Sequence, residues 1–232
     1  MGPGTKGARV RTDTKPADPP ALPDYYETVA RDLLAFCGPP AGEVWVDLGS
    51  GAGGVGLALL AGSAGATLVL VDPDAAALRR GLAAASERGL GGRVVAVAAP
   101  AERLPLPDES VDVVVSRGSI YFWRDPAQGL REVWRVLRPG GRAMIGGGLG
   151  REYPPWARRE FIRRRRASVA AKGPGALRAF AEARSPATFR RLARDAGLPH
   201  FEVVGHGGLD HEHPDAGIGV WLRLRKERDD GR

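Results

Sequence analysis

The sequence predicts an α/β domain built on a doubly wound, seven-stranded sheet that ends in an antiparallel hairpin. Short apolar runs bounded by turn residues alternate with stretches of helical periodicity, a pattern typical of strand–helix–strand units. The run 67–72 is almost continuously apolar before it ends in an acid, as in a strand buried on both faces of a sheet. The run 45–48 passes directly into a glycine turn, and a helical run follows at once. We therefore expect one domain, over 24–228.

Capping and turn residues set the expected boundaries of the elements. Residues 1–23 are rich in Gly, Pro and charge and hold few large apolar side chains, so they are expected to form a disordered arm. Asp24 is the expected N-cap of the first helix, and Ser185 followed by Pro186 marks the start of the last. Helices are expected over 25–36, 55–60, 75–87, 127–137 and 185–196. Strands are expected at 45–48, 67–72, 93–97, 111–116, 143–146, 201–204 and 219–224, the last two forming the hairpin.

The glycine turn from Gly49 to Gly54 predicts a ligand cradle at the carboxyl end of the first strand. Glycine takes up positive φ and lets the backbone approach a ligand closely, and the next helix points its free N–H groups at the turn. The same spacing fits the dinucleotide fingerprint. Asp47, two residues before the turn, would repel a pyrophosphate but attract the ammonium and sulfonium groups of S-adenosylmethionine.

At this stretch the chain resembles the class I methyltransferases. Their first motif is an acidic residue followed by Gly-x-Gly-x-Gly, here Asp47, Gly49, Gly51 and Gly53. Asp72 lies 23 residues past Gly49, at the tip of the second expected strand, where a carboxylate can accept hydrogen bonds from two ribose hydroxyls. That position suits a nicotinamide cofactor as well as S-adenosylmethionine. Asp74 can cap the following helix, which leaves Asp72 free for the ligand.

Two later stretches resemble the small-molecule group of methyltransferases often called type 11. Residues 100–116 match its signature of an acid, then Leu-Pro, then a hydrophobic strand, and residues 130–142 match its Arg-Val-Leu-Arg-Pro-Gly-Gly-Arg signature. With the glycine turn, the matches span about 44–147 in the right order. The resemblance implies a Rossmann-like sheet and S-adenosylmethionine as the cofactor. It also implies that Ala101 and Glu102 lie against the adenine edge, although the pattern of this group has Asp where this chain has Glu102.

The cofactor and the acceptor are expected at the carboxyl ends of the strands, where ligands of such sheets bind. The expected cofactor-binding residues are Asp47, Gly49, Ser50, Gly51, Asp72, Pro73, Ala101, Glu102 and Ser116. Arg117 and Tyr121 stand where many relatives have a His pair after the fourth strand, so we expect them at the acceptor. An aromatic wall is favoured for Tyr121 over a general base, and His206 is kept as a candidate base. The spacing of His206, His211 and His213 matches no established zinc site, so no metal is expected.

An insertion over about 148–184, between the fifth strand and the next helix, is expected to form a helical cap. Tyr153, Trp156, Phe161 and Ile162 could give this cap one apolar face. The segment 151–194 holds thirteen Lys or Arg residues against three acidic ones, a net charge of +10, whereas the whole chain carries +7. A solvated lid, a clamp for an anionic substrate and a nucleic-acid footprint are the three interpretations of this charge.

Composition restricts the class of protein. The single cysteine, Cys37, excludes an intramolecular disulfide framework and agrees with a reducing compartment. It closes an apolar helical run, so we expect a buried packing residue. The chain has no apolar run of membrane-spanning length, and we expect no membrane partner and a cytoplasmic location.

We expect an S-adenosylmethionine-dependent methyltransferase that acts on a small molecule, with an anionic acceptor as one option. The alternatives are an RNA methyltransferase that uses the Arg-rich segment 151–194, a dinucleotide-dependent oxidoreductase, and a non-catalytic cofactor-binding relative. The residues leave the acceptor atom (O, N, S or C) and the oligomeric state open.

Overall fold

The strands of this protein form one mixed sheet, as predicted. The computed structural model describes residues 21–38, 43–63, 65–207 and 219–227. Within them the strand order is β3-β2-β1-β4-β5-β7-β6. The parallel strands are β1 (Val44–Leu48), β2 (Thr67–Asp72), β3 (Val94–Ala98), β4 (Val111–Arg117) and β5 (Leu137–Gly147). The antiparallel strands β6 (Phe201–Gly205) and β7 (Val220–Arg225) complete one edge, which confirms the predicted C-terminal hairpin.

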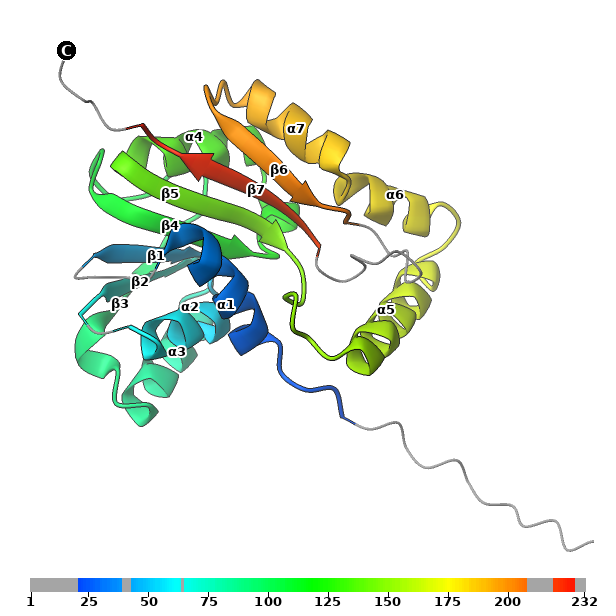
Figure 1. Ribbon diagram of the computed structural model, residues 1–232, viewed down its shortest axis with the longest axis horizontal. Helices are drawn as coiled ribbons and strands as arrows, with labels where there is room; N and C mark the ends of the chain where they lie inside the picture. Colours follow the sequence, from blue (N-terminus) through cyan, green and yellow to red (C-terminus); the bar gives the residue numbers. More distant parts are fainter. Residues whose placement is uncertain (1–20, 39–42, 64, 208–218, 228–232) are drawn as a thin grey trace, which may run out of the picture.

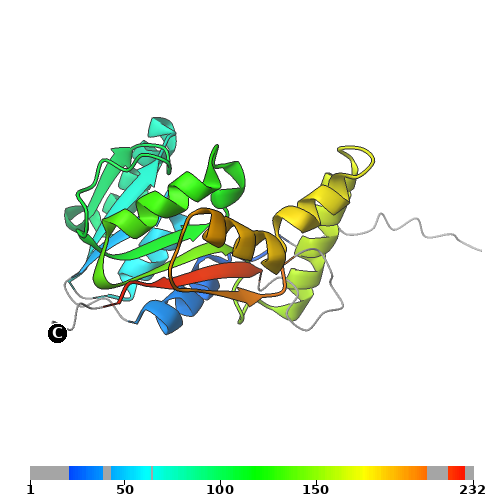
Figure 2. The same ribbon diagram turned by 90° about the horizontal axis from the view of Figure 1, so that it is seen from above.

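Helices cover both faces of the sheet (Figures 1 and 2). On one face lie α1 (Tyr26–Cys37), α2 (Gly54–Ala61) and α3 (Ala75–Glu87). On the other lie α4 (Pro126–Val136) and α7 (Pro186–Asp195). Two further helices, α5 (Pro155–Ala170) and α6 (Ala176–Ala183), project past the end of the sheet, and short 3₁₀ turns occupy Gly91–Arg93 (η1) and Ile120–Phe122 (η2).

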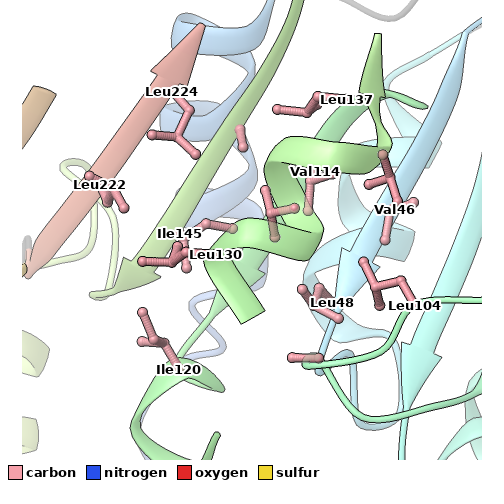
Figure 3. Close-up of a cluster of buried hydrophobic side chains, with 14 of the residues drawn as sticks. Val46, Leu48, Leu104, Val114, Ile120, Leu130, Leu137, Ile145, Leu222 and Leu224 are labelled. Atoms are coloured by element: carbon pink, nitrogen blue, oxygen red, sulfur yellow. The ribbon is translucent and has the colours of Figure 1, made fainter. Parts of the chain in front are cut away.

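The strand β2 shows why the central strands are continuously apolar. Side chains of a strand alternate between the two faces. Leu68 and Leu70 therefore pack with α1, α2 and α3, whereas Val69 and Val71 pack in the layer under α4 and α7. Figure 3 shows this second layer, in which Leu130 of α4 lies beside Ile145 of β5. Both faces are covered, so the central strands are mostly apolar, and the buried polar residues Asp47 of β1 and Ser116 of β4 have hydrogen-bond partners.

Two helix starts follow the predicted capping chemistry, and a third differs from it. The side chain of Asp74 accepts a hydrogen bond from the N–H of Ala76, and that of Ser185 accepts one from Thr188, which confirms both predicted caps. The helix α1 differs, because its N-cap is Tyr25 and not Asp24. The carboxylate of Asp24 nevertheless accepts the N–H of Tyr26 at 2.6 Å, so it reaches the helix start from one residue further out.

The fifth strand is longer than predicted. The sequence predicts a helix over 127–137 and a strand at 143–146, but β5 already begins at Leu137, which pairs with Val111. Its register shifts between Val111 and Val113, and Gly140 adopts φ +84°. The N–H of Gly140 donates to the carbonyl of Lys226 at 2.7 Å. The Pro-Gly-Gly stretch is thus an irregular, bulged start of the strand, because the end of β7 supplies it with a hydrogen-bond partner.

The expected cap contains two helices, and its apolar face is smaller than predicted. Tyr153 and Ile162 are buried, but Trp156 is 45% exposed and packs in neither of their clusters. The hydroxyl of Tyr153 donates to the carbonyl of Pro23 at 2.8 Å, and Leu22 packs nearby. The chain is therefore already packed against the domain at Leu22, which lies inside the arm expected over 1–23. Residues 1–20 of that arm lie outside the described residues.

We predict that Leu70→Ala destabilises the fold by about 2–5 kcal/mol, because the side chain is 0% exposed and its removal leaves a cavity. Leu82→Ala on α3 is the matched control, since Leu82 is 38% exposed and its loss should cost less than about 1 kcal/mol. Urea unfolding followed by far-ultraviolet circular dichroism measures both changes. Equal losses in the two variants would contradict the described burial.

Candidate functional site

A cleft of about 690 Å³ opens at the carboxyl ends of β1, β2 and β4. We call it the main cleft. It is lined by Leu48, Gly49, Gly51, Asp72, Pro73, Ala99, Pro100, Ala101, Glu102, Arg117, Gly118, Ser119, Phe122, Trp123, Arg124, Asp125 and Gln128. Six of the nine residues expected to bind a cofactor are thus brought together at one edge of the sheet, and Asp47, Ser50 and Ser116 are the three outside this lining.

The glycine turn forms one wall of the main cleft. The N–H groups of Gly49 and Ser50 both donate to the carbonyl of Val71, at 2.7 and 3.1 Å. Gly49 and Gly51 have φ values of +68° and +54°, where glycine is favoured. A Cβ on Gly49 would overlap Ser119, whereas a Cβ on Gly51 would meet nothing within 4 Å. Gly49 is therefore needed for packing, and Gly51 leaves its backbone open to a ligand.

Asp72 joins the glycine turn to the end of β2. Its Oδ2 accepts the N–H of Gly51 at 2.8 Å, and its Oδ1 accepts the N–H of Asp74 at 2.8 Å. A carboxylate has about four acceptor sites, so each oxygen can still accept a further hydrogen bond. The side chain faces the main cleft, and it can receive two hydroxyl donors there.

Asp47 lies behind the turn and not in the cleft. It is 3% exposed, and its Oδ2 accepts the N–H of Gly56, in the first turn of α2, at 2.9 Å. Burial raises the pKa of Asp47 to about 7; the hydrogen bond from Gly56 acts against this rise, and the charge of Asp72 adds to it. Asp47 therefore accepts an N–H group from the first turn of α2 and does not itself line the main cleft, and its attraction to a cationic ligand stays a prediction.

Glu102 and the two serines have partners within the protein. The Oε1 atom of Glu102 accepts the N–H groups of Arg124 and Asp125, at 2.5 and 3.0 Å. This ties the 100–103 turn to the start of α4 and leaves the second carboxylate oxygen for other donors. Ser116 is fully buried, with its Oγ 2.5 Å from the Oγ of Ser119. Ser50 lies in the turn, where its N–H is held by Val71.

A second cavity, of about 240 Å³, opens beside the main cleft. We call it the side pocket. It is lined by Arg117, Gly118, Tyr121, Phe122, Gly147, Gly148, Leu149, Phe161, Ile162, Arg165, Phe180, Arg184, Gly207, Gly219 and Val220. Arg117, Gly118 and Phe122 line both cavities, so the two spaces meet at the end of β4. Phe122 is 85% exposed at this junction.

Arg117 and Tyr121 occupy fixed positions in the side pocket. The Nε of Arg117 donates to the carbonyl of Gly148 at 3.0 Å, and its Nη1 donates to the hydroxyl of Tyr25 at 2.9 Å. Burial raises the pKa of Tyr121 to about 12, although Arg184 and Arg117 act in the opposite direction. The phenol therefore keeps its proton at neutral pH and forms a wall of the pocket. His206 is exposed at the end of β6, and His211 and His213 lie outside the described residues.

Sequence reasoning did not single out Phe180 and Arg184, which line the side pocket. Leu177, Phe180 and Arg184 are spaced three and four residues apart, and this helical spacing could have identified a common face. In the described part of the chain no three His, Cys, Asp or Glu residues cluster as metal ligands would. No helix among the described residues has both the length and the apolar character needed to cross a membrane.

Comparison with known proteins shows similarity to methyltransferases. Residues 46–145 match the family model described as a methyltransferase domain. The 2-methyl-6-phytyl-1,4-hydroquinone methyltransferase 2 of Oryza sativa subsp. japonica is 38% identical over 117 residues, 50% of this chain and 32% of that protein. The ubiquinone/menaquinone biosynthesis C-methyltransferase UbiE of Hahella chejuensis is 37% identical over 45% of this chain and 43% of that protein. The matches thus span less than half the length of these curated relatives.

Solved structures resemble the whole fold. A protein of Methanococcus maripaludis assigned as an S-adenosyl-L-methionine-dependent methyltransferase is 25% identical, with a TM-score of 0.69 over 90% of this chain and 88% of that one. A SAM-dependent methyltransferase from Aquifex aeolicus shares the fold at 18% identity, with a TM-score of 0.60 over 86% of this chain and 90% of that one.

We predict that the stability of the wild-type protein falls as pH rises and that Asp47→Asn makes the stability less dependent on pH. The pKa of Asp47 is about 7 in the fold against an ordinary value of 3.8. Because the pKa of Asp47 is higher in the folded state than in the unfolded chain, its contribution to the free energy of unfolding is fully present below pH 3.8. That contribution falls by at most about 4 kcal/mol as the pH rises to about 7. Asparagine keeps an oxygen for the N–H of Gly56. Urea unfolding of both proteins at pH 4.5 and 8 tests this, and parallel pH profiles would contradict it.

We also predict that Gly51→Ala weakens binding of S-adenosylhomocysteine about tenfold or more, because the new methyl group enters the main cleft. Gly89→Ala is the matched control. Gly89 has φ +70° and equally open surroundings, but it lies between α3 and η1. Both variants should lose about 1–2 kcal/mol of stability from left-handed backbone. Calorimetric titration compares their affinities, and equal affinities would show that Gly51 does not face the ligand.

Proposed function

We propose that the chain transfers the methyl group of S-adenosylmethionine to a small-molecule acceptor, because residues 46–145 match the methyltransferase domain model and the fold resembles that of an assigned S-adenosylmethionine-dependent methyltransferase. The resemblance drawn from the three sequence stretches is thereby confirmed, and S-adenosylmethionine is the cofactor that this family implies. The observation that carries the proposal is the junction of two cavities. A cleft of about 690 Å³ meets a smaller pocket of about 240 Å³, which has four aromatic lining residues, at Arg117, Gly118 and Phe122.

The residues of the main cleft fit the cofactor. Asp72 offers two carboxylate oxygens to the ribose hydroxyls, and Gly51 lets the chain of the methionine approach the backbone. Glu102 and Ala101 both line the cleft, so the second carboxylate oxygen of Glu102 can accept from an adenine amino group and the backbone at Ala101 can pair with a ring nitrogen. Pro73 and Ala99 supply apolar walls beside the ring.

The chain's own task in the reaction is positioning. When bound, S-adenosylmethionine supplies an electrophilic methyl group and a neutral leaving group, so little covalent help is required. The residues at the junction align the acceptor with the methyl group and exclude water. Arg117, held by Gly148 and Tyr25, orients the acceptor at the point where the cavities meet. Tyr121 keeps its proton at neutral pH and serves as a wall of the pocket or as a hydrogen-bond donor.

We further propose an acceptor with an aromatic ring. Two curated relatives are named for methylation of a hydroquinone and for a step of ubiquinone and menaquinone biosynthesis. Tyr121, Phe161 and Phe180 supply aromatic contacts in the side pocket. Its volume of about 240 Å³ suits one ring with short substituents, so a long isoprenoid tail would have to extend out of it.

The two other activities considered from the sequence have less support. The methyltransferase match argues against a dinucleotide-dependent oxidoreductase. The RNA alternative needs the arginines of 151–194 to be free on one surface, but Arg163 and Arg164 pair with Glu160, and Arg191 pairs with Asp195. A salt titration of RNA binding separates this alternative from the small-molecule acceptor.

We predict that S-adenosylhomocysteine binds in calorimetry while NADH does not, and that Asp72→Asn weakens this binding about tenfold, because a charged acceptor for the ribose hydroxyls is lost. Asp74→Asn is the matched control, since Asp74 caps α3 and lies outside the lining of the main cleft. A screen for S-adenosylhomocysteine release with phenols and hydroquinones then tests turnover. Tight binding of NADH alone would overturn the proposed function, and cofactor binding without release on any acceptor would favour a non-catalytic relative.

A further inference from the structure

We propose that the acceptor carries an anionic group, a carboxylate or a phosphate, that binds Arg184 and Arg165 at the outer end of the side pocket. This inference rests on the proposed function, because it assigns the side pocket to the methyl acceptor. It adds the chemical class of the acceptor and the residues that recognise it.

Arg184, which follows α6, contacts two aromatic side chains of the side pocket. Its guanidinium lies between two aromatic rings, 3.7 Å from the ring centre of Tyr121 and 3.6 Å from that of Phe180. Stacking on both faces leaves the N–H groups at the edge of the guanidinium for a ligand in the same plane. That geometry suits the paired oxygens of a carboxylate or phosphate.

A second cation lies near Arg184. Arg165 of α5 lines the same pocket, and its guanidinium is 5.5 Å from the ring centre of Phe161. Burial lowers the pKa of Arg184; Tyr121 opposes this, and the positive charge of Arg165 adds to it. Two like charges that line the same pocket repel each other, and the positive charge of Arg165 disfavours the charged form of Arg184. An anion bound between them removes that cost.

The described residues supply no such anion. None of the described side chains that line the pocket is acidic. Among the described residues, ion pairs on the cap helices involve Arg163 and Arg164 with Glu160, and none involves Arg117, Arg165 or Arg184. The arginines on α5 therefore differ in role: Arg163 and Arg164 are neutralised by an acid on their own helix, whereas Arg165 faces the pocket.

The position of the two arginines also orients the acceptor. Arg117 and Gly118 line both cavities, so the end of the acceptor that receives the methyl group lies beside them. Arg165 and Arg184 line the side pocket but not the main cleft. The anionic group is thus bound away from the reacting atom, with the ring between the two ends against Tyr121.

Binding of matched probes to the full chain, saturated with S-adenosylhomocysteine, tests this inference. The probes are 4-hydroxybenzoate, its neutral isostere 4-hydroxybenzamide, and phenyl phosphate, measured by calorimetry. We expect at least one of the two anions to bind about tenfold or more tightly than the amide. The stronger of the two anions then identifies the group as a carboxylate or a phosphate.

Three variants test whether the preference for the anion depends on Arg184 and Arg165 or only on the positive charge of the cap. Arg184→Gln and Arg165→Gln should each abolish most of the preference for the anion. Arg165 is exposed, so the Arg165→Gln variant should fold even if Arg184→Gln does not. Arg159→Gln, on an exposed position of the same helix, should keep the preference. Equal binding of acid and amide, absence of binding by every probe at millimolar concentration, or a preference that survives both pocket variants would overturn the inference. Failure of S-adenosylhomocysteine to bind would instead overturn the proposed function.

Discussion

Three consecutive N–H groups, those of Gly49, Ser50 and Gly51, hold the glycine turn to the end of β2. Two of them donate to the carbonyl of Val71 and the third to the carboxylate of Asp72. These bonds need positive φ at Gly49 and Gly51, and they direct the chain into α2. The wall of the main cleft, the start of α2 and the orientation of Asp72 all depend on this single connection between neighbouring strands.

The two cavities differ in charge. Three acids, Asp72, Glu102 and Asp125, line the main cleft together with Arg117 and Arg124, whereas the side pocket has three arginines and no acid among its described lining residues. A cofactor with a sulfonium and an acceptor with an anionic group would each meet complementary charge. Arg117 lies where these regions meet and is held in place by Tyr25 and Gly148. The same sheet edge can thus hold two ligands of unlike charge beside each other.

Local patterns predicted most of the fold. The apolar run 67–72, the cap at Asp74 and the helix start at Ser185 all depend on residues close together in the chain, and the structure confirms them. The start of β5 was not predictable in this way, because its partners are Val111 and Lys226, which lie far from it in sequence. The position of Asp47 was partly predictable. Side chains alternate along β1, so Asp47 lies on the same face of the sheet as Trp45, where it contacts α2.

The sequence by itself determined the strand and helix order, the glycine turn and the class of cofactor, because these depend on short-range periodicity, backbone freedom and motif spacing. Only the tertiary structure decided what surrounds the acceptor. Tyr121, Arg165 and Arg184 come from η2, α5 and the end of α6, and they meet only because the cap folds back over the end of β4. Arg163 and Arg165 belong to the same run of arginines, and the sequence alone gives no basis for assigning them different roles. Their different roles arise from the rotation of α5, which turns one toward the pocket and the other toward Glu160.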